Sequence, residues 1–175
     1  MNKSIYTLWS LCLALAGTLS WAQAAAPNDA QIAGIVVAAN KVDIDAGELA
    51  RTSAKDKQVK DFGQRMVADH TGVNKQAAAL VKKLKVTPEE SATSKALKEG
   101  GAANIAKLKG MKGAAFDKAY VDNEVTYHQA VIDAVDKTLL PSAKNADLKA
   151  LIEKVRPALV QHLEHAKHLQ AQLGK

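Results

Sequence analysis

The sequence contains very little cysteine, proline or aromatic residue. Its 175 residues include one cysteine and four prolines, and aromatic residues make up 4% of the chain. So little proline excludes a proline-rich linker, and so few aromatic residues argue against a β-sandwich built on aromatic packing. The sequence also lacks a glycine-rich phosphate loop and any motif that places a serine beside a histidine. These absences favour a protein that is not an enzyme.

Helix-forming residues make up much of what is present. Hydrophobic residues account for 47% of the chain and charged residues for 24%, which is enough apolar material for a packed core. The sequence is rich in Ala, Lys, Leu and Gln, which are good helix formers. The formal net charge is +6, but the lysines are spread over positions expected to face solvent, an arrangement typical of solubility.

Residues 1–24 have the layout of a secretory signal peptide. Lys3 precedes an apolar run at residues 8–19, and a small-x-small cleavage pattern follows at residues 22–24. The run is short for a membrane span, so we expect cleavage rather than an uncleaved anchor. Residues 25–175 would then form a single domain with no thiol and no membrane span. The sequence therefore predicts a protein exported to the bacterial periplasm, where nucleic acid is not an expected partner.

Apolar residues recur at every third or fourth position after the predicted cleavage site, which is the period of an amphipathic helix. The pattern predicts four long helices, with Pro141 ending the third and Asn145 or Ser142 capping the fourth. A short helix is expected in the connection between the second and third long helices. The predicted helices cover residues 29–54, 57–84, 94–108 and 114–140, and the last runs from its cap to about residue 173.

The lengths of the connections indicate how these helices are arranged. The connections near residues 55 and 143 are short, which implies two antiparallel hairpins. Between the hairpins, residues 86–112 are long enough to cross the full height of a bundle. We therefore predict an all-α fold, a ferritin-like antiparallel four-helix bundle with a long connection between its second and third helices. A simple up-down bundle is the alternative.

The apolar residues of each long helix form a seam, which is the line along the face expected to pack into the core. Ionisable residues interrupt the seam of each helix. His70, His128 and His162 occupy seam positions on three different helices, and Asp43 lies on or beside the seam of the first. Burying such groups is costly unless something pairs with them, so we expect them to meet. Asp43, His70 and His128 lie at about 20–22 Å from the nearest turn, and His162 lies about one helical turn off that level. Glu124 precedes His128 by one turn.

Imidazole and carboxylate groups are ligands that divalent transition metals accept. Asp43, His70, His128 and His162 suit one four-coordinate Zn, Cu, Fe or Mn ion, with Glu124 as an optional fifth ligand. Asp69, Tyr127 and Glu164 adjoin these residues in the sequence and are expected to orient the imidazoles. The alternative is a buried hydrogen-bond network of histidines that binds no metal.

Four ordered motifs resemble the family called domain of unknown function 4142. The resemblance implies a ferritin-like four-helix bundle in exported bacterial proteins, without an assigned activity. Members of the family often carry Glu at position 43 and Ala at position 63. The Glu-x-x-His spacing of ferritin-like di-iron proteins is absent, which favours a mononuclear histidine-rich site. The motifs are Asn40-x-x-Asp43-Ile44-x-x-Gly47-x-Leu49-Ala50, Phe62-Gly63-Gln64-Arg65-Met66-Val67-Ala68-Asp69-His70, Phe116-Asp117-x-x-Tyr120 with His128, and Pro157-Ala158-Leu159-x-x-His162-Leu163-x-x-Ala166.

Three functional hypotheses follow from the sequence. The first is a periplasmic bundle that binds a transition metal at mid-height, in a buffering, sensing or stress-protection role. The second is a non-catalytic structural or interaction module of the cell envelope. The third is a metal-dependent oxidase or hydrolase, which would need an open coordination position beside a pocket.

Overall fold

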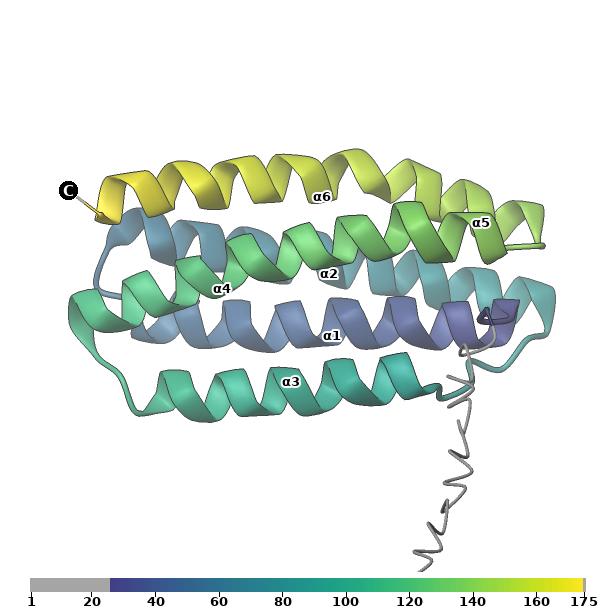
Figure 1. Ribbon diagram of the computed structural model, residues 1–175, viewed down its shortest axis with the longest axis horizontal. Coiled ribbons are helices and arrows are strands. Elements are labelled where there is room, and N and C mark those ends of the chain that lie inside the picture. The colour runs from purple at the N-terminus through teal and green to yellow at the C-terminus, as the bar shows by residue number, and fades with distance from the viewer. Residues whose placement is uncertain (1–25, 175) are drawn as a thin grey trace, which may run out of the picture.

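The structure is a computed structural model that describes residues 26–174, and the predicted signal peptide at residues 1–24 lies outside this part of the chain. Every regular element within the described residues is helical (Figure 1), which confirms the all-α prediction. The elements are α1 (Asp29–Ser53), α2 (Lys57–Leu84), α3 (Ala92–Lys109), α4 (Gly113–Ala134), the π-helical turn η1 (Val135–Leu139), α5 (Leu140–Ser142) and α6 (Ala146–Leu173).

Side chains at the helix starts explain why the helices begin where they do. Asn28 caps α1 in a capping box with Gln31, and Asp56 accepts hydrogen bonds from backbone amides in the first turn of α2. Asn145 does the same for α6. Of the two caps considered for the last helix, Asn145 is therefore the one used, and Ser142 ends α5.

The four longest helices are α1, α2, α4 and α6. They lie side by side along the long axis of the molecule (Figure 1). Contacts join α1 to α2, α2 to α6, α6 to α4 and α4 to α1. The four helices therefore surround a common interior, and this is where their apolar seams meet. Among the described helices, none combines the length and the apolar character that a membrane span needs.

Two carboxylates connect segments that are distant in the sequence. Asp29, at the start of α1, accepts hydrogen bonds from the backbone amides of Lys144 and Asn145 at 2.9 and 3.0 Å. Asp117, near the start of α4, accepts hydrogen bonds from the backbone amides of Lys55 and Asp56 at 2.8 Å, in the turn between α1 and α2. Helices α2 and α4 therefore start at the same end and run in the same direction (Figure 1). The connection between them, which contains α3, therefore crosses the length of the molecule (Figure 1).

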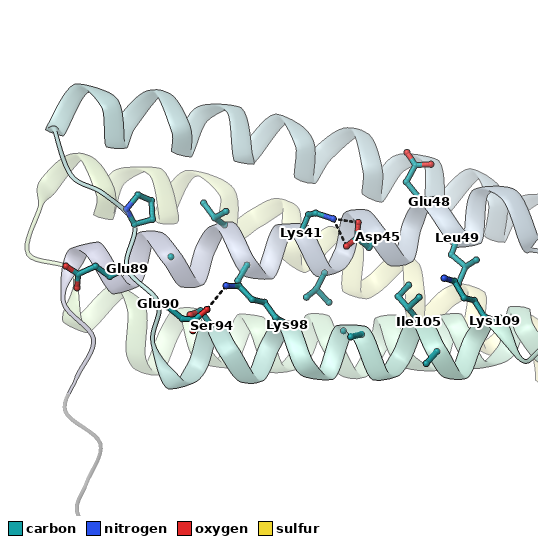
Figure 2. Close-up of a pocket in the computed structure, with 18 of the residues that line it drawn as sticks. Lys41, Asp45, Glu48, Leu49, Glu89, Glu90, Ser94, Lys98, Ile105 and Lys109 are labelled. Atoms are coloured by element: carbon teal, nitrogen blue, oxygen red, sulfur yellow. Dashed lines mark hydrogen bonds and ion pairs between the residues drawn. The ribbon is translucent and has the colours of Figure 1, made fainter.

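The short helix expected in this connection is α3, and it packs on the outer side of α1. The two helices approach closely at Gly101, where a Cβ atom would lie 2.7 Å from a methyl carbon of Val42. A groove remains between α1 and α3 (Figure 2). Four of its charged side chains form two ion pairs, Lys98 with Glu90 at 2.7 Å and Lys41 with Asp45.

The sequence predicted that the third long helix stops before Pro141, and this prediction is wrong. Instead α4 continues through the π-helical turn η1 into α5, which contains Pro141. In a regular α-helix a proline ring clashes with the carbonyl group four residues earlier. The wider turn directly before Pro141 relieves that clash, because the amide of Leu140 bonds to the carbonyl of Val135, five residues back.

The interior contains two apolar clusters with a polar layer between them. One cluster surrounds Phe62, Phe116 and Tyr120, and the other surrounds Ile32 and Ile152. Full burial of such a side chain contributes about 1.5–3 kcal/mol, so both clusters stabilise the fold strongly. The polar layer consists of Asn40, Asp43, His70, Glu124, His128 and His162, all of which are buried.

Candidate metal centre

All five residues predicted as metal ligands lie together in the polar layer. Each of the four long helices α1, α2, α4 and α6 contributes at least one of them. Their side chains are almost completely inaccessible, with 0% of His128 and 4% of His70 exposed. The five residues are Asp43, His70, Glu124, His128 and His162.

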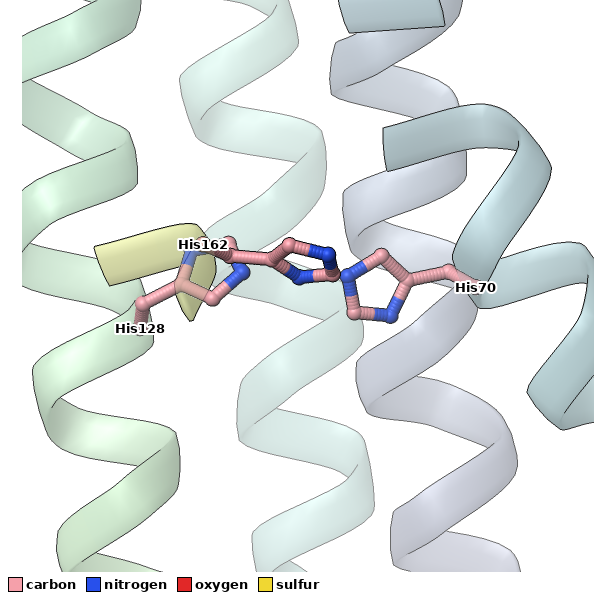
Figure 3. Close-up of side chains that lie close together, drawn as sticks. All are labelled: His70, His128 and His162. Atoms are coloured by element: carbon pink, nitrogen blue, oxygen red, sulfur yellow. The ribbon is translucent and has the colours of Figure 1, made fainter. Parts of the chain in front are cut away.

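The three imidazoles point toward one another across the interior (Figure 3). The ring centroids of His70 and His162 are 5.2 Å apart, and those of His128 and His162 are 5.4 Å apart. One nitrogen from each ring lies within 4.8 Å of the others, and Asp43, Glu124 and His128 form a second such group. His128 belongs to both groups, so the two groups make one continuous cluster.

His70 is held by an amide whose orientation is fixed. The side-chain nitrogen of Asn40 donates to the carbonyl of Val36 at 2.8 Å, so its Oδ1 must face His70, where it lies 2.7 Å from Nδ1. An amide oxygen only accepts hydrogen bonds, and therefore Nδ1 of His70 carries a proton. The other ring nitrogen, Nε2, faces Oδ2 of Asp43 at 2.9 Å.

His128 and His162 are oriented in the same manner by other acceptors. Nδ1 of His128 lies 3.1 Å from the backbone carbonyl of Glu124, and Nε2 of His162 lies 2.8 Å from Oδ2 of Asp69. Asp69 is in turn paired with Arg65 at 3.3 Å. In each of the three rings, one nitrogen thus donates to a fixed acceptor, and the other nitrogen is directed into the cluster.

Several atoms directed into the cluster make no hydrogen bond of regular geometry among the described residues, although Nε2 of His70 and Nε2 of His128 lie 2.9 Å and 3.4 Å from Oδ2 of Asp43. An unsatisfied buried polar atom costs about 1–3 kcal/mol, and here several lie within a few ångströms of each other. Such a concentration requires an explanation. The atoms without such a hydrogen bond are Nε2 of His70, Nε2 of His128, Nδ1 of His162, both carboxylate oxygens of Asp43, Oε2 of Glu124 and the hydroxyl oxygen of the neighbouring Tyr120.

The charges of the cluster follow from burial and from its neighbours. Burial opposes ionisation of Asp43, but the facing His70 and His128 outweigh it and lower the pKa of Asp43 to about 2. Burial and the nearby Asp43 carboxylate raise the pKa of Glu124 well above its usual range. Burial also lowers the pKa of His162 to about 4, despite its hydrogen bond to Asp69. At neutral pH, Asp43 is therefore anionic and His162 is neutral, and Glu124 keeps its proton to a higher pH than an ordinary glutamate does.

Of the three residues expected to orient the imidazoles, only Asp69 forms a hydrogen bond with one. Tyr127 packs edge-on against His128, but its hydroxyl group donates to the carbonyl of Ala39 at 2.9 Å. Glu164 lies on the outer face of α6, where 64% of its side chain is exposed and it pairs with Lys167. The predictions for Tyr127 and Glu164 are therefore corrected: neither residue hydrogen-bonds to an imidazole.

Two residues of the cluster were not predicted from the sequence. Asn40, which orients His70, lies one turn before Asp43 on the same face of α1. This spacing is the feature of the sequence that could have identified Asn40 as part of the site. Tyr120 lies one turn before Glu124 and is fully buried. Burial and the carboxyl groups of Glu124 and Asp43 raise the pKa of the Tyr120 hydroxyl well above its usual range.

Comparison with known proteins gives one match. The family described as domain of unknown function (DUF4142) matches residues 16–169, which is most of the chain. No curated protein and no solved structure matches the chain. The chain therefore belongs to the domain of unknown function 4142 family, as its sequence motifs suggested.

Proposed function

We propose that this protein binds one divalent transition metal ion in the interior of a ferritin-like four-helix bundle. One observation carries the proposal: three imidazoles, each with one nitrogen donating to a fixed acceptor, direct their remaining nitrogens into one cluster with an anionic carboxylate. This is the arrangement in which metal-binding histidines are held, because the acceptor fixes the tautomer and the ring orientation. His70, His128, His162 and Asp43 would hold the ion.

The donor set restricts the metals that this cluster would take. Imidazole nitrogen and carboxylate oxygen suit Zn, Cu, Fe and Mn, whereas Mg and Ca prefer sites made only of oxygen. No thiolate is present to favour a soft ion such as Cu(I). Glu124 can serve as a fifth ligand only after losing its proton, since its pKa is raised by burial.

The proposed role is buffering, sensing or stress protection in the bacterial periplasm. The compartment is inferred from the signal-peptide layout of residues 1–24. The parallel direction of α2 and α4, with a connection that crosses the length of the molecule, supports the ferritin-like arrangement. A metal held by almost completely buried side chains suits storage or sensing better than rapid turnover of a large substrate.

Thermal unfolding with added metal tests this proposal. Binding to the folded state alone raises the melting temperature, so Zn²⁺ should raise that of the chelator-treated wild-type protein. The shift should disappear in His128→Ala and persist in His168→Ala, because His168 lies exposed on the surface of α6. Equal shifts in the two variants would place the metal at the surface. No shift with Zn²⁺, Cu²⁺, Fe²⁺ or Mn²⁺ would favour a structural module with a buried histidine network.

A further inference from the structure

An apolar cavity of about 170 Å³ adjoins the cluster on one side. The three imidazoles and Asp43 border one end, and the rest extends between the helices toward η1. The other polar residues that border the cavity are Asn40, Asp69, Thr93 and Tyr127. The apolar lining includes Val36, Val73, Leu97, Val131, Val155 and Leu159.

Small side chains keep this space open. Ala39 on α1, Ala130 and Ala134 on α4, and Ala158 on α6 all border the cavity. A leucine at any of these positions would project further into it. Protein interiors are normally packed with few voids larger than a water molecule, so a space of this size needs an explanation.

The cavity also has an opening. Thr93 on α3 and Ala130 on α4 border it, and both residues are exposed. The cavity therefore reaches the surface near Thr93 of α3 and Ala130 of α4.

The lining decides which molecules are held there. A buried water needs about two to four polar partners, and the long apolar part of the cavity offers almost none. A cavity of about 150 Å³ lined by Leu, Ile and Phe stays dry and binds benzene or xenon. The present cavity has a similar volume and is lined mainly by Ala, Val, Leu and Ile, but it opens to the surface and is also bordered by the polar side chains of the cluster.

We propose that this cavity binds a small, uncharged apolar molecule of about the size of benzene, and that the bound molecule lies against the imidazoles of His70, His128 and His162. A molecule in this position would lie beside an ion held by those rings. That connection rests on the proposed metal-binding function, whereas binding in the cavity itself does not require a metal.

The test is a titration of benzene into the chelator-treated, metal-free protein, followed by NMR. The methyl signals of Val73, Val131 and Leu159 should shift and saturate, together with the ring signals of His70 and His128. Methyl signals of Val121 and Leu173, in and beside the other apolar cluster, serve as internal references and should not move.

Two variants locate the binding. Ala134→Leu fills part of the cavity and should weaken benzene binding by at least about tenfold. The matched control is Ala79→Leu, the same change at an exposed position of α2, which should bind benzene as the wild type does. If Ala134→Leu does not fold, Val131→Phe narrows the same space from the same helix.

The outcomes separate this proposal from the metal proposal. The absence of saturable shifts at the cavity methyls, or equal binding in wild type and Ala134→Leu, would overturn the cavity site. Shifts of the methyl signals without shifts of the histidine rings would overturn its placement against the cluster. Metal binding is measured separately by thermal shift, so its failure would not be confused with either result.

Discussion

The Nε2 atom of His70 lies 2.9 Å from Oδ2 of Asp43, yet neither atom forms a hydrogen bond of acceptable geometry. Nδ1 of His70 already carries a proton toward Asn40, so an attractive contact between Nε2 and the carboxylate requires either a second proton on the ring or a metal ion between the two atoms. Two electron-rich atoms at this distance repel each other unless a proton or a cation is shared between them. A metal ion bound between these two atoms would meet this requirement, which supports the proposed function.

Asn40 sets the tautomer of His70, so its loss should weaken metal binding without direct contact with the ion. We expect Asn40→Leu to lower Zn²⁺ affinity by about 10–100-fold, the usual effect of removing an acceptor behind a metal-binding histidine. Asn40→Asp keeps an acceptor oxygen in place and should retain more of the affinity. Calorimetric titration measures both. An unchanged affinity in Asn40→Leu would show that His70 does not bind through Nε2.

His162 should make the metal-free protein less stable in mild acid. Its pKa in the folded state is about 4, against an ordinary value of 6.5. Below about pH 6.5, His162 binds a proton in the unfolded chain but stays unprotonated in the folded protein. The free energy of unfolding therefore falls as the pH is lowered to about 4. The loss from this group is about 3 kcal/mol at most. The free energy of unfolding, measured with urea from pH 4 to 7.5, gives the slope.

The matched variant for this titration is His162→Gln, which has no imidazole to protonate. The difference in unfolding free energy between wild type and variant should shrink as the pH falls from about 6.5 to about 4. A difference that stays constant over this range would mean that His162 titrates normally.

Glu124 should act on stability in the opposite direction. Burial and the Asp43 carboxylate hold its pKa above the ordinary value of 4.5, so the folded protein keeps a proton that the unfolded chain loses as the pH rises. Its stabilising contribution is therefore present in acid and lost above about pH 4.5. We expect Glu124→Gln, which cannot ionise, to gain stability relative to wild type as the pH rises to 7. A constant difference across this range would contradict the raised pKa.

The same variant tests whether Glu124 is a metal ligand. If Glu124 binds the ion, Zn²⁺ binding releases its proton, because ligands must be deprotonated. Calorimetry in buffers of different ionisation enthalpy should then count about one more proton released by wild type than by Glu124→Gln. Equal proton release would remove Glu124 from the ligand set and leave Asp43 as its only carboxylate.

Asp117 is the residue whose loss should damage the fold without touching the site. It is buried and accepts hydrogen bonds from the amides of Lys55 and Asp56. Asp117→Ala leaves both amides without their partner and should cost about 1–3 kcal/mol per group that stays buried. Asp61→Ala breaks only an exposed pair with Lys57 and should cost under about 1 kcal/mol. Chemical denaturation measures both, and similar losses would contradict the role given to Asp117.

Most of the fold was predictable because the apolar period of each helix is regular and the caps are standard residues. The end of α4 was not, since Pro141 is normally read as a stop. No sequence pattern predicts the π-helical turn that accommodates this proline. The two carboxylates that fix the connections, Asp29 and Asp117, pair with backbone amides, and such partners leave no signature in a sequence.

The proposed metal ligands were predictable because they lie on or beside the apolar seams of the helices. Counting residues from the turns placed His162 about one helical turn away from His128, yet their rings lie 5.4 Å apart. Helical side chains lean toward the N-terminus of their own helix. Since α4 and α6 run in opposite directions, His128 leans away from their shared turn and His162 leans toward it, which removes most of the offset. Glu164 was misplaced because adjacency in sequence puts a helical neighbour on a different face.

The most direct test of the central claim is elemental analysis of the protein purified without chelators. The account predicts close to one Zn, Cu, Fe or Mn ion per chain in the wild type and in His168→Ala, and almost none in His128→Ala. A metal content that is negligible in the wild type, or equal in all three proteins, would contradict a metal centre in the interior of the bundle.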